Sequence, residues 1–440
     1  MQGEVVPSAW RSFVALFLLV RISSAADPSS PTFSRDVLPI LQKHCQSCHR
    51  PGEPAPMSFL SYEATRPWAK AIKAAVLTRK MPPWPADPQS GHFANDRTLK
   101  PAEIAILAAW ADSGAAPGDP KDGPPPIPWR EGWTIPPDVV LSLPEAFPVP
   151  ASGVVELTSF TIPSGFTKDT WITSIEIRPG NPAVVHHVSV AIVPHEEGVV
   201  YGVGRSEPKE RDRAGVQVNH VSKADRLAPL MGLEATYDPG AEPVDYRPYH
   251  AAKLIPAGSD LVIQMHYTPS GTATTDQTRI GLTLAKESPE FQFVTAIPTA
   301  LRDAAHFRIP ARDPNWECRA AVVFREEVRI AWLMPHMHLR GKDMTYRLVY
   351  PGGPSQPLLS VKWNFNWQLG YRLETPVVAP KGSRLEVTAH FDNSANNPFN
   401  PNPDTDVWWG DQTFEEMMVP WFGVLAPLHA DPAKLMSYAR

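Results

Sequence analysis

The sequence predicts a small helical domain followed by two antiparallel β-sandwich domains of jelly-roll type. The chain has 440 residues, a length that suggests three domains. Its 51 prolines and 26 glycines favour strands, turns and extended linkers over long helices. After the first third of the chain, short strand-like runs recur between turn signals, and long helical patterns are absent. Representative runs are Val154–Leu157, Thr170–Ile177, Arg279–Leu284 and Arg384–His390.

The overall composition is that of a globular protein. Hydrophobic residues make up 43% of the chain and charged residues 20%, which is enough apolar material for several cores. The formal net charge is −5, and the sequence contains no long basic run. We therefore expect no nucleic-acid partner.

Residues 1–26 have the features of a secretory signal peptide. Arg11 precedes a short apolar run, and small residues follow the run and end at Ala25 and Ala26. Such a run is typical of a signal and too short for a membrane span. Cleavage near these alanines would give an exported protein, periplasmic or extracellular, without an integral membrane domain. Because Glu4 offsets Arg11, an uncleaved anchor is the alternative.

Cys45 and Cys48, with His49 directly after them, form CxxCH, the attachment motif of covalent haem c. Two thiols one helical turn apart can add to the two vinyl groups of a haem, and His49 can supply the proximal imidazole. The alternative is a CxxC zinc or redox element. Helix-like runs on either side, the second beginning at Pro101, favour a cytochrome c domain over residues 27–118.

A methionine is the expected sixth ligand of the haem iron, because a thioether raises the haem potential. Met81 lies in a stiff loop flanked by prolines, where its sulfur can be held against iron. Met57 is the competitor, but it directly precedes a predicted helix start and has the character of a core residue. We expect His44 and His92 to be structural or surface groups.

Residues 119–140 form a Pro-rich linker that is extended and semi-rigid. We expect Trp129 and Trp133 to dock it onto a neighbouring domain. If the two CxxCH thiols bind haem, Cys318 has no partner left for an intramolecular disulfide. A buried free thiol is therefore expected at this position.

His336 and His338 follow an alternating run, residues 327–332, that predicts a strand. Residues two apart on a strand point to the same face. The two histidines can therefore present their imidazoles side by side, as half of a metal site, while Met337 points away. The alternative is a partly buried pair of core histidines.

Further candidate ligands lie in or beside apolar, strand-like runs, namely His186, His187, His266 and Met417. Histidine and methionine together suit copper cycling between Cu(I) and Cu(II) better than they suit calcium or magnesium. Adjacent strand residues point to opposite faces, so His186 and His187 can share a metal only at a bulge or a strand end. A nearby Asn-Pro pair favours such an irregularity.

In this order, the motifs HHV, QMHYTPSGT, HMHLRGKDM and EEMM resemble the copper type II, ascorbate-dependent monooxygenases. This is the family of peptidylglycine α-hydroxylating monooxygenase and dopamine β-monooxygenase. The resemblance covers about residues 140 to 440. It implies a sandwich with the electron-transfer copper, over residues 141–285, and a sandwich with the O2-binding copper, over residues 286–440.

The resemblance also implies two ligand sets. A tandem His pair and a distant His hold the electron-transfer copper, and an HxH pair with a Met holds the copper at which O2 binds and catalysis occurs. By motif these are His186, His187 and His266 for the first copper, and His336, His338 and Met417 for the second. Ascorbate supplies the electrons in the animal enzymes. In this chain a fused haem would pass them singly to the first copper.

The chain departs from the family at its substrate-holding positions. Met334 stands where peptide-hydroxylating relatives carry an Arg, and Val419 and Trp421 stand where they carry Asn and Tyr. The sequence therefore argues against peptidylglycine and for a small apolar or aromatic substrate. The animal members also carry several disulfides, which three cysteines cannot provide.

Other residues near the motifs have less defined roles. Gly341 follows the family pattern and is expected to permit a tight backbone turn. Gln264 and Tyr267 either support a metal ligand or are ordinary strand residues. The remaining histidines have no partner motif and are expected to be surface or core residues. They are His195, His220, His250, His306, His390 and His429.

Three functions are compatible with these features. The first is an exported haem–copper monooxygenase that uses O2, a small substrate and electrons from an external cytochrome or small reductant. The second is a periplasmic cytochrome/copper electron-transfer or copper-binding protein without hydroxylase turnover. The third is a carbohydrate- or surface-binding sandwich beside an ordinary cytochrome. The complete set of six candidate copper ligands favours the first.

Overall fold

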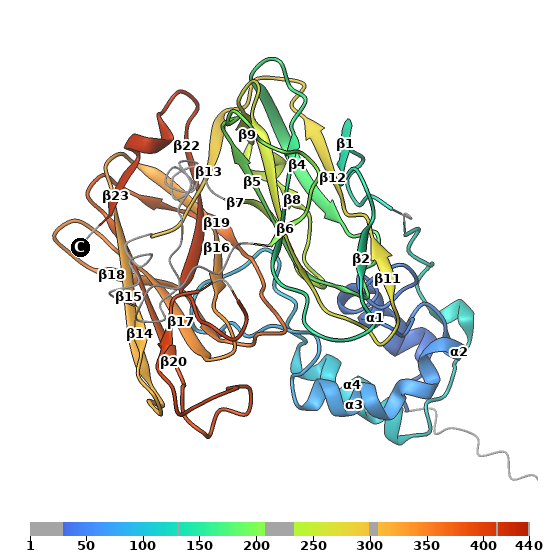
Figure 1. Ribbon diagram of the computed structural model, residues 1–440. Helices are drawn as coiled ribbons and strands as arrows, with labels where there is room; N and C mark the ends of the chain where they lie inside the picture. Colours follow the sequence, from blue (N-terminus) through green and yellow to red (C-terminus); the bar gives the residue numbers. More distant parts are fainter. Residues whose placement is uncertain (1–29, 130–131, 207–232, 299–306, 411, 439–440) are drawn as a thin grey trace, which may run out of the picture.

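The computed structural model describes residues 30–129, 132–206, 233–298, 307–410 and 412–438. Strand accounts for 37% and helix for 13%, which confirms that the chain is mostly β with few helices (Figure 1). The expected signal peptide, residues 1–26, lies outside the described residues, and so do His220 and His306.

The helices of the N-terminal part pack around a core of their own. Leu41 and Trp110 are fully buried in it. The longest helix begins at Pro101, whose missing N–H is not needed in the first turn, and the Glu103 carboxylate accepts the backbone N–H of Lys100 at 2.7 Å. The helices are η1 Phe33–Val37, α1 Leu38–His44, α2 Tyr62–Thr65, η2 Arg66–Trp68, α3 Ala69–Leu77, α4 Pro101–Asp112 and η3 Pro120–Asp122.

The first β unit has two sheets with a shared core. One sheet has the order β6-β3-β10-β5-β7, and the strands β1-β12-β4-β9 lie across the core from it. On β10, Leu261, Ile263 and Met265 alternate with less buried residues, which is the period of a strand with one face in the core. The strands are β1 Val139–Ser142, β2 Phe147–Val149, β3 Thr158–Pro163, β4 Thr170–Arg178, β5 Val185–Val193, β6 Arg205–Ser206, β7 Leu233–Tyr237, β8 Val244–Asp245, β9 Ala251–Ile255, β10 Asp260–Tyr267, β11 Thr274–Asp276 and β12 Arg279–Leu284; η4 is Arg247–Tyr249.

The second β unit repeats this arrangement around a larger core. A five-stranded sheet, β18-β17-β20-β15-β23, shares its core with the strands β13-β22-β16-β19. Cys318 is buried here as a free thiol, as expected. The strands are β13 Phe291–Ala296, β14 Arg308–Ile309, β15 Trp316–Phe324, β16 Val328–His336, β17 Gly341–Val349, β18 Ser355–Lys362, β19 Tyr371–Ala379, β20 Arg384–Phe391, β21 Val407–Trp408, β22 Val419–Pro427 and β23 Met436–Tyr438; η5 is Pro432–Lys434.

One nine-stranded sheet runs through both β units. Its order is β1-β12-β4-β9-β13-β22-β16-β19, with β8 paired to β4 beside this path. The units join where β13 pairs in parallel with β9, with Phe291 opposite Ala251. This sheet crosses the boundary expected between residues 285 and 286, and Tyr246, Phe293 and Leu425 pack together at the crossing.

Three of the four representative strand predictions are confirmed. Thr170–Ile177, Arg279–Leu284 and Arg384–His390 lie in β4, β12 and β20. The prediction for Val154–Leu157 is wrong, because β3 begins only at Thr158. Val154 is 83% exposed and follows a glycine in a left-handed turn, so no sheet neighbour holds it.

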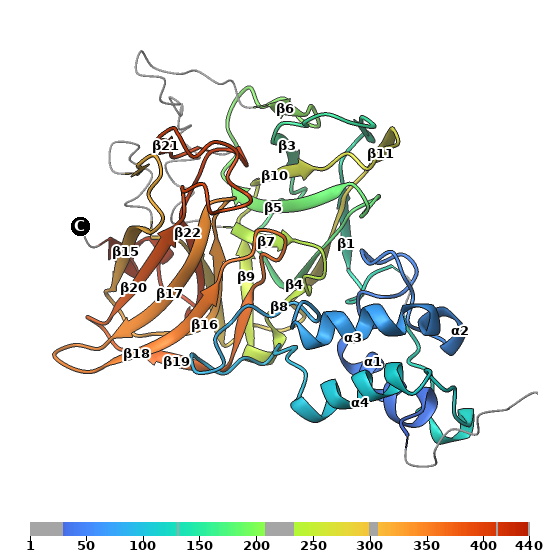
Figure 2. The same cartoon turned by 90° about the horizontal axis from the view of Figure 1, so that it is seen from below.

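The loop between α3 and α4 docks the helical part onto the second β unit. Ala86 pairs with Val361 of β18, and Phe93 pairs with Leu373 of β19. The rings of Trp84, Phe93 and Tyr371 lie 5.0–5.9 Å apart, centroid to centroid. Figure 2 shows this loop reaching β18 and β19 from the helices. The helical part is therefore fixed by an interface as well as by its linker.

The linker docks through both of its expected tryptophans. Trp129 lies under the guanidinium of Arg50, whose carbon is 4.6 Å from the ring centroid. Trp133 covers Gly281 of β12, and a Cβ there would come within 2.8 Å of its ring. The linker thus contacts the helical part at one end and the first β unit at the other.

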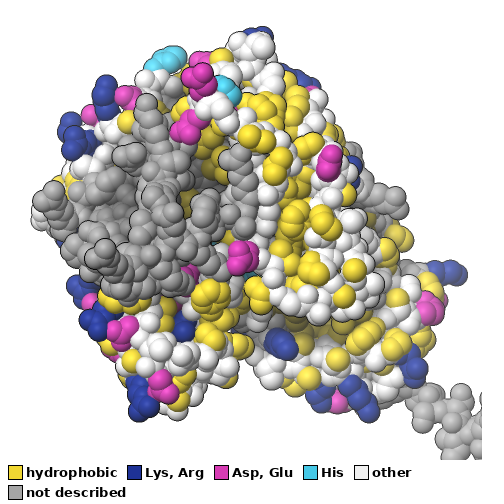
Figure 3. Space-filling model, in the orientation of Figure 1, with side chains coloured by type: hydrophobic (Ala, Val, Ile, Leu, Met, Phe, Trp, Pro, Cys, Tyr) yellow, Lys and Arg dark blue, Asp and Glu magenta, His cyan; other side chains and the backbone are white. Residues whose placement is uncertain are grey.

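No helix within the described ranges is both long and apolar enough to cross a membrane. On the face in Figure 3, the described Lys and Arg side chains lie among Asp and Glu and form no continuous basic patch.

Replacing Phe307 by Ala tests the core of the second β unit. Phe307 is fully buried, and its ring centroid lies 5.2–5.6 Å from those of Trp316, Phe391 and Trp409. The cavity left by Phe307→Ala should lower the free energy of unfolding by about 3–5 kcal/mol, measured from the urea midpoint. Phe399→Ala, at a residue 60% exposed, should change it by no more than about 0.5 kcal/mol. Equal effects would contradict this packing.

Candidate functional site

Imidazoles from both β units converge at the seam between them. His187 on β5 stands opposite His266 on β10 in the strand register, and His336 ends β16. The ring centroids of His187 and His266 are 5.6 Å apart, those of His187 and His336 are 5.7 Å apart, and those of His336 and His338 are 5.4 Å apart. The two predicted ligand sets therefore adjoin each other, which the sequence motifs did not reveal.

A β-bulge lies at the tandem pair His186 and His187. His187 pairs with His266, but Tyr267 pairs with Val185, so His186 is the extra residue on β5. Such a bulge redirects a side chain that regular alternation would turn away. The half-buried His186 ring stacks on Phe365 at 5.1 Å. The expected irregularity is thus confirmed.

Each of three imidazoles is held at Nδ1. His187 Nδ1 lies 2.9 Å from Asp238 Oδ1, His336 Nδ1 lies 2.5 Å from Gln368 Oε1, and His338 Nδ1 lies 3.3 Å from the Glu415 carbonyl oxygen. These acceptors favour the tautomer with a proton on Nδ1 and a lone pair on Nε2, the arrangement of metal-binding histidines.

Two Nε2 atoms in this region have no hydrogen-bond partner among the residues that the structure describes. They belong to His186 and His338, and both are buried. An unpaired polar atom inside a protein is unfavourable unless something else binds it. The orphaned atoms, together with the held Nδ1 atoms, fit a cluster built to coordinate metal through Nε2.

Burial favours the uncharged form of four imidazoles in the cluster. Burial lowers the pKa of His338 to about 4. Burial, reinforced by the neighbouring imidazoles, also lowers the pKa values of His336 and His266 well below the usual range, and that of His186 below it. Neutral imidazole is the form that binds metal, so these side chains are ready to ligate near pH 7.

The ring spacing is slightly wider than that of a closed metal site. With metal–nitrogen bonds of about 2 Å, two imidazoles on one tetrahedral ion have ring centroids roughly 5 Å apart. In the described part of the chain, no three His, Cys, Asp or Glu side chains form a ready-made metal group. Two neighbouring rings are therefore spaced nearly as two rings on one ion would be, whereas the described residues bring no three such ligands together.

The HxH and EM motifs meet through Glu416. β16 and β22 pair with His336 opposite Val419, so His338 and Met417 each lie two residues beyond this last pair, on the same side of it. The buried Glu416 carboxylate accepts the backbone N–H groups of His338 at 2.9 Å, Arg340 at 2.6 Å and Met417 at 3.1 Å. Burial raises the pKa of Glu416 to about 7. Met417 is half-buried and packs against the second core.

The CxxCH motif lines a cavity of about 610 Å³ in the helical part. Cys45, Cys48 and His49 all line this cavity, and Met57 and Met81 line it too. Burial raises the pKa of the Cys45 thiol to about 12 and lowers that of His49. The volume, apolar walls and donor set fit a covalently held haem, with either methionine available as sixth ligand.

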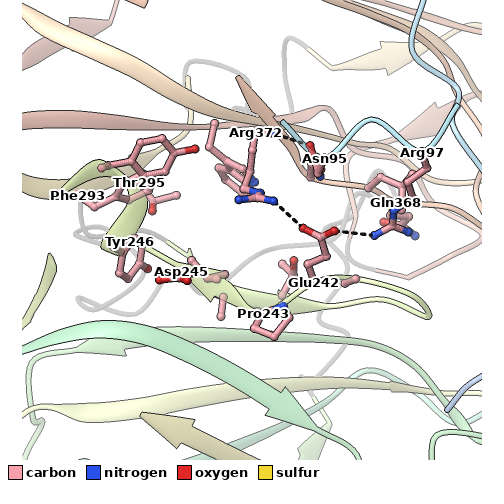
Figure 4. Close-up of a pocket in the computed structure, with 18 of the residues that line it drawn as sticks. Asn95, Arg97, Glu242, Pro243, Asp245, Tyr246, Phe293, Thr295, Gln368 and Arg372 are labelled. Atoms are coloured by element: carbon pink, nitrogen blue, oxygen red, sulfur yellow. Dashed lines mark hydrogen bonds and ion pairs between the residues drawn. The ribbon is translucent and has the colours of Figure 1, made fainter. Parts of the chain in front are cut away.

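A second cavity lies where the helical part and both β units meet (Figure 4). Glu242 pairs there with Arg372 at 3.0 Å and with Arg97 at 3.8 Å, and Gln368 forms part of the wall. At about 70 Å³ the cavity is far smaller than the roughly 300–1,000 Å³ of ligand pockets. It is a junction that fixes these segments, not a substrate site.

Several secondary expectations are resolved by the contacts. Gln264 accepts a hydrogen bond from Ser189 at 3.2 Å, and the Tyr267 hydroxyl donates to Asp276 at 3.1 Å, so both serve the sheet. Gly341 is needed for space rather than for a turn, because a Cβ there would come within 2.5 Å of Trp363.

The remaining described histidines agree with structural or surface roles. His44 and His390 pair with carboxylates of Glu103 and Asp343, and His195 pairs with Asp260. His92, His250 and His429 are exposed.

Three residues of the site were missed by sequence reasoning. Glu416 stands inside a quoted motif, and its place beside Met417 could have drawn notice. Asp238 and Gln368 lie in loops far from any motif, and no local pattern marks them.

Comparison with known proteins adds little. No family model and no curated protein matches the chain. One solved structure that matches is described as the structure of infectious bursal disease virus Gx strain, with 10% identity, 70% of this chain and 79% of that chain covered, and a TM-score of 0.15. Such a score bears on neither fold nor function.

Replacing Gln368 by Leu tests whether its side-chain oxygen orients the His336 imidazole. The change leaves His336 Nδ1 buried without its acceptor and frees the ring to turn. Copper affinity, measured by competition with a chromophoric chelator, should fall by about 10–100-fold. Gln89→Leu, at an exposed residue, should leave affinity unchanged. Equal affinities in the two variants would show that Gln368 does not orient a ligand.

Proposed function

We propose that the chain is an exported haem–copper monooxygenase that hydroxylates a C–H bond of a small apolar or aromatic substrate. The observation that carries the proposal is the convergence of imidazoles from β5, β10 and the end of β16 in one cluster. Acceptors hold Nδ1 of His187, His336 and His338, and the buried Nε2 atoms of His186 and His338 have no partner among the described residues. The CxxCH cavity in the same molecule supplies the second cofactor site.

Six side chains would hold two copper ions. His186, His187 and His266 form one set, and His336, His338 and Met417 form the other. When bound, copper supplies O2 activation at the second set and electron transfer at the first, and haem supplies single electrons drawn from an external cytochrome or small reductant. The thioether of Met417 favours Cu(I), the form that reacts with O2.

The chain's own groups orient these ligands and keep water out. Asp238 and Gln368 fix the rings of His187 and His336, and Glu416 fixes the backbone of His338 against that of Met417. His336 and His338 are 9% and 1% exposed, so competing reactions with bulk water are limited.

An apolar substrate is supported by the faces of β16 and β22. Met334 lies two residues before His336 on β16 and so shares its face. Trp421 stands opposite Met334, and Val419 stands opposite His336. None of these side chains carries a positive charge that could pair with a carboxylate, and all three are apolar or aromatic.

The helical part would be a cytochrome c domain. His49 would be the proximal ligand of a haem joined to Cys45 and Cys48, and Met81 the sixth ligand, with Met57 as competitor. Haem attachment of this kind agrees with export by the expected signal at residues 1–26. The two β units would be jelly-roll sandwiches in this proposal.

A second candidate is a periplasmic cytochrome/copper electron-transfer or copper-binding protein without hydroxylase turnover. The residues at positions 334, 419 and 421 favour it, because the family's substrate-holding groups are absent there. The full ligand sets favour the monooxygenase.

Oxygen uptake driven by substrate separates these functions. Haem- and copper-loaded protein with an electron donor should consume O2 in proportion to hydroxylated product when given small aromatic substrates, and the product oxygen should come from labelled O2. The double variant His336→Ala, His338→Ala should lose this coupled uptake. His195→Ala, at an exposed side chain outside the cluster, should keep it.

Uptake without any hydroxylated product, across a panel of apolar and aromatic compounds, would favour the electron-transfer candidate. If the double variant keeps the coupled O2 uptake, the second ligand set takes no part in the reaction.

A further inference from the structure

We infer that the segment from Asp238 to Glu242, between β7 and β8, is the path that carries electrons from the haem cavity to the histidine cluster. The inference rests on the proposed function, since it requires both cofactors. It names residues of the electron path that lie outside every sequence motif, and it names His187 as the residue at which electrons enter the histidine cluster. Each electron leaves ferrous haem, giving ferric haem, and reduces Cu(II) to Cu(I); the external donor then restores ferrous haem.

At one end the segment is bonded to the cluster. Tyr237, the last residue of β7, pairs with Val188, the residue after His187. This register sets Asp238 beside His187, and its Oδ1 lies 2.9 Å from His187 Nδ1. A hydrogen bond of this kind is short and strong, and it couples the imidazole to the Asp238 side chain at the start of the segment.

At the other end the segment touches a haem-attachment thiol. Pro239 and Gly240 both line the CxxCH cavity. A Cβ on Gly240 would lie 3.2 Å from Cys48 Sγ, so the space beside the glycine faces this sulfur. In the attached state that sulfur is part of the cofactor. One through-space step from this sulfur to Gly240 and two peptide links from Gly240 to Asp238 therefore lead to the residue that orients His187.

Ion pairs hold the segment in this position. Arg97 of the helical part donates from Nη2 to the Gly240 carbonyl at 2.8 Å. Glu242 pairs with Arg97 and with Arg372 of β19 (Figure 4). The segment is thereby fixed to both the helical part and the second β unit, and a fixed contact is what efficient electron transfer requires.

A rival path runs through the loop before β19. Trp367 lines the haem cavity, and the next residue, Gln368, accepts from His336. This path would enter the cavity through the Trp367 side chain, whereas the Gly240 path enters through a backbone placed beside the haem-attachment sulfur of Cys48. We therefore assign the transfer to the Gly240 path.

The two glycines Gly240 and Gly258 allow a matched test. Both have positive φ, +84° and +68°, so alanine strains the backbone similarly at either. At Gly240 the new methyl would press on the Cys48 sulfur, whereas nothing lies within 4 Å of the Cβ position at Gly258. Gly240→Ala should therefore push the segment from the haem, and Gly258→Ala should not.

The experiment uses the oxidised holoprotein with haem and copper bound. A photoreductant reduces the haem in a flash under anaerobic conditions, and the haem absorbance then follows its reoxidation by Cu(II) in the same molecule, with the loss of the Cu(II) EPR signal as second readout. The wild type should reoxidise at a rate independent of protein concentration. Gly240→Ala should slow this several-fold at unchanged haem potential and copper content, and Gly258→Ala should match the wild type.

Arg97→Gln weakens the contacts of Arg97 with Gly240 and Glu242 without adding volume, and it should also slow the electron transfer. This variant replaces Gly240→Ala in the test if Gly240→Ala fails to fold. Normal rates in both variants, or a slow rate only in Trp367→Leu, would overturn the assignment and leave the proposed function intact. If copper-loaded wild type reoxidises no faster than copper-free protein, the proposed haem-to-copper function itself fails.

Discussion

The candidate site depends on one constraint, which is that three imidazole rings inside the protein must each have an acceptor at Nδ1. Without Asp238, Gln368 and the Glu415 carbonyl, these rings would carry unpaired N–H groups or turn their Nε2 atoms away from the cluster. Each acceptor comes from a loop that other contacts fix. The geometry of the cluster is therefore set by the packing of the whole molecule.

The helical part contributes to this packing although it carries none of the copper ligands. Asn95 donates to the Gly370 carbonyl and accepts from the Arg372 backbone N–H, which holds the chain directly after Gln368. Arg97 holds the segment that begins at Asp238. Docking of the CxxCH region thus stabilises the same loops that orient His187 and His336, so haem attachment and copper affinity are expected to depend on each other.

The sequence motifs predicted those parts of the arrangement that depend only on residues close together in the chain. The strand period placed His336 and His338 on one face, and the strand rule required a bulge at His186, which the register contains. The sequence could not predict that the two ligand sets lie side by side, because this depends on β13 pairing in parallel with β9 across the expected boundary. Asp238 and Gln368 were missed for the same reason, as their partners are distant in sequence.

The central claim is that the cluster holds two copper ions in a molecule that also carries haem. The most direct test is the copper-to-haem ratio of protein matured in a periplasm and reconstituted with copper, compared with the His336→Ala, His338→Ala double variant. The account predicts two coppers per haem in the wild type and one in the variant. No copper above background in either protein would contradict it and leave a cytochrome beside a binding sandwich.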